Sequence, residues 1–146
     1  MPPRFQPSSC NALLRQAIDL RRLYRHAARQ CEPGLRVVLN ESAQTLDLLI
    51  ADLQAQRRAE GGTPRRHGSW RGVGRRHLAG WLMRLAARPD NAWIRALAYQ
   101  EAALLGAFER AIATAPAPAT LVLRRELSRL RDIHLDLDNL GGAARY

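Results

Sequence analysis

Residues 61–81 of this 146-residue chain read Gly-Gly-Thr-Pro-Arg-Arg-His-Gly-Ser-Trp-Arg-Gly-Val-Gly-Arg-Arg-His-Leu-Ala-Gly-Trp. Glycine at the end of a helical segment, with proline just beyond it, is the usual sign of a helix C-terminus. On both sides lie long segments whose apolar residues recur every three or four positions, with almost no strand pattern. The stretch therefore indicates a bridge between two pairs of helices.

The segment before the bridge divides into two helices at Glu32-Pro33-Gly34, a break that fits only a tight helical hairpin. Residues 1–8 are proline-rich and predict a disordered lead, and Ser8 or Ser9 can cap the first helix. The apolar seam of the first helix is Cys10, Leu13, Ala17, Leu20, Tyr24, Ala27 and Cys31. The seam of the second helix is Leu35, Val38, Leu39, Ser42, Leu46, Leu49, Ile50 and Leu53.

Two more long helices follow the bridge, which extends over residues 61–89 and includes a short amphipathic helix expected at 75–87. Asp90 or Asn91 caps the third long helix, and Pro116-Ala117-Pro118 closes a second hairpin. The third seam is Ile94, Leu97, Glu101, Leu104, Phe108, Ala111 and Ala115. The fourth is Leu123, Leu127, Leu130, His134 and Leu137, and we expect Gly141-Gly142 to end that helix.

Two hairpins joined by one long crossover predict an all-α fold. We expect a ferritin-like, up-down-down-up four-helix bundle over residues 9–142, followed by a tail at 143–146. If the bridge runs the length of the bundle, the second and third helices are parallel. The chain is long enough to bury a core without disulfides or a structural metal.

The two cysteines and the apolar content limit the classes of protein. Cys10 and Cys31 lie on one helix roughly 30 Å apart, so we interpret them as small core residues that cannot form a disulfide with each other. No apolar run approaches the roughly 18 residues that span a bilayer. The N-terminus lacks the apolar stretch of a signal peptide, and we therefore expect a cytoplasmic protein.

The net charge of +10 comes entirely from arginine, since all 23 basic residues are Arg. Many of them lie in the bridge, where a positive patch would attract nucleic acid or another polyanion. The residues of this candidate site are Arg65, Arg66, Arg71, Arg75 and Arg76. The interpretation that we favour is a solvated bridge in a protein whose coding sequence favours arginine throughout, and the polyanion site is the alternative.

Two seam positions are polar, Glu101 on the third helix and His134 on the fourth. Counting from the hairpin between these helices places both side chains at nearly the same height. Tyr24 and Glu41 are also level with each other in the first hairpin. We expect a structural polar cluster of Tyr24, Glu41, Glu101 and His134, because an isolated buried charge is costly and needs a partner.

The alternative for the same residues is a remnant metal site formed by Glu41, Glu101 and His134. A dimetal carboxylate centre takes a glutamate from each of two helices and Glu-x-x-His from each of the other two. Here Gln44 follows Glu41 where histidine should stand, and Arg131 precedes His134 where glutamate should stand. The ligand set is therefore incomplete, and we expect no cofactor, with a single metal ion as the alternative.

With these residues in place, the chain resembles a bacterial group of ferritin-like four-helix-bundle domains of unknown function. The mark of the group is a bridge of the form Gly-Gly-x-Pro-x-x-x-Gly-Ser-x-x-Gly followed by Arg and Trp. Here the motif residues are Gly61, Gly62, Pro64, Gly68, Ser69, Gly72, Arg76 and Trp81. The resemblance covers residues 11–140 and includes Asp19, Tyr24, Glu41, Glu101, Phe108 and His134. It implies a ferritin-like bundle with no established activity.

These observations favour a non-catalytic scaffold or partner-binding protein with a degenerate metal site, which could form a homodimer through an exposed apolar helix face. The second hypothesis is a metal-dependent redox or iron-handling protein. The third is a protein that binds a polyanion or nucleic acid through the bridge arginines.

Overall fold

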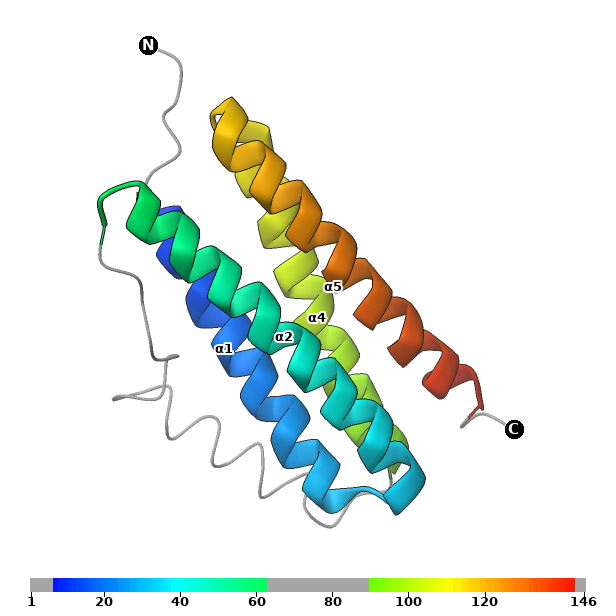
Figure 1. Cartoon of the computed structure of the whole chain (residues 1–146). Coiled ribbons are helices and arrows are strands. Elements are labelled where there is room, and N and C mark those ends of the chain that lie inside the picture. The colour runs from blue at the N-terminus through cyan, green and yellow to red at the C-terminus, as the bar shows by residue number, and fades with distance from the viewer. Residues whose placement is uncertain (1–6, 63–89, 144–146) are drawn as a thin grey trace.

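The computed structural model describes residues 7–62 and 90–143, and within them every regular element is a helix. The helices are α1 (Pro7–Gln30), α2 (Pro33–Ala59), α4 (Asp90–Thr114) and α5 (Ala117–Ala143). Figure 1 shows α1 with α2 as one hairpin and α4 with α5 as the other. The predicted all-α four-helix architecture is confirmed.

The four helices surround one core in the cyclic order α1, α2, α5, α4, because α1 and α5 each pack beside both α2 and α4. Neighbouring helices run in opposite directions, so α2 and α4 are parallel and diagonally opposed (Figure 1). The bridge itself, with the helix expected at 75–87, lies outside the described residues.

Most residues of the predicted seams of the first three long helices are buried in the core, whereas Val38 and Ala115 are only half-buried. Leu14, Leu39, Leu46, Leu97 and Phe108 are among its fully buried side chains. Every seam residue of α1 is buried, and both cysteines are free thiols inside this core. In the part of the chain that the structure describes, 31 apolar residues are buried, and their burial supplies the main stabilising term through the hydrophobic effect.

The helix ends follow the turn residues closely. Glu32 is the N-cap of α2, where its carboxylate accepts a hydrogen bond from the Leu35 backbone N–H at 3.1 Å, and Pro33 occupies the first turn. Gly61 has φ of +82°, the left-handed conformation that glycine adopts most easily after a helix. Two boundaries differ from expectation: α1 begins at Pro7, and α5 continues through Gly141-Gly142 to Ala143.

The fourth seam is where the expected pattern is wrong. Glu126 and Ile133 are buried, whereas the side chain of His134 is 31% exposed and lies at the flank of the seam. The buried line on α5 is Ala119, Leu123, Glu126, Leu130, Ile133 and Leu137, which alternates spacings of four and three. The sequence pattern predicted Leu127 as the seam residue at this height. Leu127 is buried, but its charged neighbour Glu126 is the residue that lies on the buried line.

Within the described ranges, no helix combines the length and the apolarity that crossing a membrane requires.

Candidate functional site

The interior holds one polar contact between α1 and α4. The Tyr24 hydroxyl donates a hydrogen bond to Glu101 Oε2 at 2.5 Å, and both residues are 0% exposed. Because a carboxyl group in an apolar interior is costly without a partner, this hydrogen bond offsets part of the cost of burying Glu101. This contact joins two of the four residues expected in the polar cluster, and a third, His134, lies beside Glu101.

His134 extends the contact toward the surface on α5. Its Nδ1 lies 3.8 Å from Glu101 Oε1, and its Nε2 lies 3.5 Å from Asp138 Oδ2. The distance between His134 Nδ1 and Glu101 Oε1 is too long for a hydrogen bond, and neither of these two atoms has a hydrogen-bond partner. Tyr24, Glu101, His134 and Asp138 therefore form a line from the core outward, which we call the polar line.

The electrostatics of the polar line keep Glu101 protonated at neutral pH. The pKa of the Glu101 carboxyl is raised to about 8, mainly by burial. The Tyr24 hydrogen bond opposes this rise, whereas the nearby Asp138 and Asp136 contribute to it. Burial also raises the pKa of the Tyr24 phenol far above its usual range, with Glu101 as the second cause. At pH 7 both groups are mainly neutral, so the interior carries little charge.

Glu41 does not join this cluster, which corrects the expectation. It is exposed and lines a separate groove of about 220 Å³ between α2 and α5, together with Ser42, Asp132 and Asp136. The buried line of α2 passes through Ser42, and the next residue around a helix lies about 100° away. Glu41 therefore faces the outside of the α2–α5 contact and not the interior.

A second buried carboxyl group, which the sequence analysis missed, joins α2 to α5. Glu126 is 0% exposed and accepts hydrogen bonds from Arg125 Nε and Arg129 Nη1, each at 3.2 Å. Arg129 Nη1 also donates to Asp52 Oδ2 at 2.7 Å. We call these four residues the α2–α5 charge cluster. The signal was present in the spacing, since Glu126 lies three residues after Leu123 and four before Leu130.

The two acids of the charge cluster have pKa values shifted in opposite directions. The pKa of Glu126 is raised to about 7, mainly by burial, and the neighbouring Asp52 contributes to the rise. Glu126 is in turn the largest cause of a lowered pKa at Asp52, and Arg129 also lowers it. At pH 7 the cluster therefore contains an ionised Asp52 beside a partly protonated Glu126.

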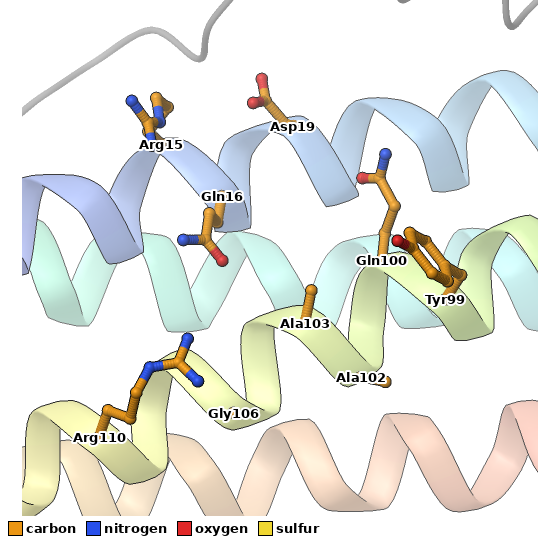
Figure 2. A pocket seen from close by; sticks show the side chains of 9 residues that line it. All are labelled: Arg15, Gln16, Asp19, Tyr99, Gln100, Ala102, Ala103, Gly106 and Arg110. Atoms are coloured by element: carbon orange, nitrogen blue, oxygen red, sulfur yellow. The ribbon is translucent and has the colours of Figure 1, made fainter.

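A larger open groove lies between α1 and α4, with a volume of about 640 Å³. Figure 2 shows Gln16 and Arg110 extending into the space between the two helices, while Ala103 and Gly106 present only small groups. Its lining residues are Arg15, Gln16, Asp19, Tyr99, Gln100, Ala102, Ala103, Gly106 and Arg110. This lining contains no histidine, cysteine or serine beside a base, so it offers no activated nucleophile.

The residues that the structure describes do not fit a metal centre. Structural and catalytic zinc sites use at least three protein ligands, and dimetal carboxylate sites use more. Glu101 and His134 supply two donors, and Glu41 lies on another face of the bundle. In residues 7–62 and 90–143, no group of three or more His, Cys, Asp or Glu side chains is placed to hold one ion.

The candidate polyanion-binding residues lie outside the described residues; they are Arg65, Arg66, Arg71, Arg75 and Arg76. His26 is half-buried: its ring centroid lies 5.7 Å from that of the fully buried Trp93, and burial lowers the pKa of His26. Trp93 thus contributes to the core itself.

Comparison with known proteins gives no assignment, since the chain matches no protein-family model, no curated protein and no solved structure. The resemblance to ferritin-like domains stays a prediction.

Proposed function

We propose that this protein is a non-catalytic cytoplasmic scaffold that binds a protein partner, and that the polar line is a structural remnant of a metal site. The observation that carries the proposal is the state of Glu101. Its Oε2 accepts a hydrogen bond from Tyr24, and its side chain is fully buried. Neither the α1–α4 groove nor the α2–α5 groove is lined by Tyr24, Glu101 or His134. A substrate entering either groove would not reach the carboxyl group.

The outer surface supports the partner-binding half of the proposal. Five large apolar side chains are 58–74% exposed: Val37, Leu48, Tyr99, Leu121 and Leu135. Four of them belong to α2 and α5, which are neighbours in the bundle. Exposed apolar residues gathered on adjacent elements are typical of a protein-binding face, whereas single ones are common on any surface.

The metal half of the proposal is tested by ligand-dependent stability. A metal that binds the folded chain raises its melting temperature, and the rise grows with the logarithm of the ratio of metal concentration to Kd. We expect Fe²⁺ and Zn²⁺, each added in excess, to shift the melting temperature of the wild-type chain and of His134→Ala equally. The matched control is His26→Ala, which removes a half-buried imidazole away from the polar line. A metal-induced rise lost only in His134→Ala would overturn the proposal.

A further inference from the structure

Between residues 121 and 135, the outward side of α5 carries a stripe of five exposed residues. Seen from the buried line of this helix, which includes Glu126 and Ile133, they lie on the opposite side. The residues of this α5 stripe are Leu121, Arg124, Ser128, Asp132 and Leu135. Leu121 is 72% exposed and Leu135 is 59% exposed, which are high values for leucine. The stripe has apolar ends, one positive charge and one negative charge.

The order of these residues is symmetric about Ser128. Leu121 and Leu135 lie equally far from it along the helix, and so do Arg124 and Asp132. If two copies of α5 pack antiparallel with a two-fold axis at Ser128, each leucine of one copy meets a leucine of the other. Each Arg124 then lies level with Asp132 of the second copy. The stripe is therefore complementary to itself, as an isologous interface requires.

The charges of the stripe are available for such pairing. Neither Arg124 nor Asp132 makes an ion pair with any residue in the described ranges. By contrast, the neighbouring Arg125, Arg129 and Arg131 are each paired within the bundle. A second copy would supply both missing partners at once, and opposite charges placed level across an interface fix its register.

We propose that the chain forms a two-fold homodimer through the α5 stripe. This inference rests on the proposed partner-binding function and names a second copy as the partner. A specific interface usually buries about 1,200 Å² or more in total, which one helix stripe does not reach by itself. The adjacent outer side of α2, with Leu48 58% exposed, extends the same surface.

Disulfide trapping tests the position of the two-fold axis. In the Ser128→Cys variant, the cysteine lies on the proposed two-fold axis. It would therefore be close to the same cysteine of the second copy, within the few ångströms that a disulfide spans. We expect the full-length variant to form a covalent dimer under mild oxidation. The control is Ala113→Cys, at another exposed position, on α4, which should remain uncrosslinked; Cys10 and Cys31 are buried. Equal crosslinking of the two variants, or none in either, would overturn the inference.

Sedimentation velocity tests the residues that hold the dimer. We expect the wild-type chain to shift between 16.4 kDa and twice that mass as its concentration rises. Leu121→Asp and Arg124→Asp should each weaken association at least about tenfold, by desolvating or opposing charge at the interface. Tyr99→Asp, on the 74% exposed residue of α4, should leave association unchanged.

The double variant Arg124→Asp/Asp132→Arg distinguishes charge pairing from general damage. It rebuilds both pairs with reversed polarity, and we expect it to recover most of the affinity lost in Arg124→Asp. A chain that is monomeric at every concentration, or a double variant weaker than the single one, would refute the homodimer. Either result leaves the metal-binding experiment unaffected, so the failure of this inference and of the proposed function are separable.

Discussion

Glu101 and Tyr24 show how one polar pair is kept inside an apolar core. The carboxyl group stays neutral because burial raises its pKa to about 8, and the Tyr24 hydroxyl satisfies one of its oxygens. A neutral hydrogen-bonded pair costs far less in the interior than a free carboxylate. At the residue scale the interior therefore serves stability and helix registration.

Replacing Glu101 tests its protonation state. The folded chain holds this proton up to about pH 8, whereas the ordinary carboxyl pKa is 4.5. Between these values the folded state binds more protons, so its free energy of unfolding falls as the pH rises. In Glu101→Gln this contribution is absent. From about pH 5.5 to pH 8, we expect urea unfolding to show the variant gaining on the order of 3 kcal/mol relative to wild type.

The pH dependence that Glu126 contributes up to about pH 7 is present in both proteins and cancels in that comparison. Parallel stability curves for wild type and Glu101→Gln would show that Glu101 is ionised in the folded chain.

Removing the Tyr24 hydroxyl tests the hydrogen bond itself. Tyr24→Phe keeps the ring in the core but leaves Glu101 Oε2 without its donor. We expect a loss of about 1–3 kcal/mol in the free energy of unfolding, the usual cost of a buried unsatisfied polar atom. The loss should shrink to a few tenths in the background of Glu101→Leu, where no acceptor remains. An equal loss in both backgrounds would assign the effect to packing.

At the scale of the element, α5 is organised by its buried acid as much as by its leucines. Glu126 faces α2 within the charge cluster, and the two arginines on either side of it turn the same way. Replacing a buried ionic group entirely by apolar residues is often neutral, whereas removing one member leaves the others unpaired. The cluster therefore sets which face of α5 meets α2.

Arg129 provides the test at this scale. Arg129→Leu removes the donor shared by Asp52 and Glu126, and we expect chemical unfolding to show destabilisation of about 1–3 kcal/mol. The double variant Arg129→Leu/Glu126→Leu should recover most of this loss, because no buried acid is left without a partner. If the two substitutions are additive, Glu126 does not depend on Arg129.

The elements also show which features a sequence can predict. Apolar spacing placed the seams of α1, α2 and α4 correctly, and it singled out Glu101 because that residue interrupts an otherwise apolar line. The same rule failed on α5, where Glu126 and Leu127 both fit the spacing. Glu41 was predicted to join the polar cluster from its height along α2. Height does not determine the direction of a side chain, and Glu41, one residue before the buried Ser42, faces outward.

At the scale of the molecule, two helical hairpins lie side by side with α2 and α4 parallel, as the length of the bridge predicted (Figure 1). The interior contains an incomplete set of metal donors, and the exposed apolar residues gather mainly on α2 and α5. We propose that such a bundle works through its surface and not through a buried metal.

Elemental analysis of the full-length protein, purified without chelators from cells grown with iron, manganese and zinc, tests this claim most directly. Two donors are too few to retain an ion through purification. We expect transition-metal content far below one equivalent per chain, with no difference between the wild-type protein and a Glu101→Gln/His134→Ala variant. One equivalent of metal in the wild-type protein that disappears in the double variant would contradict the proposal that no buried metal is used.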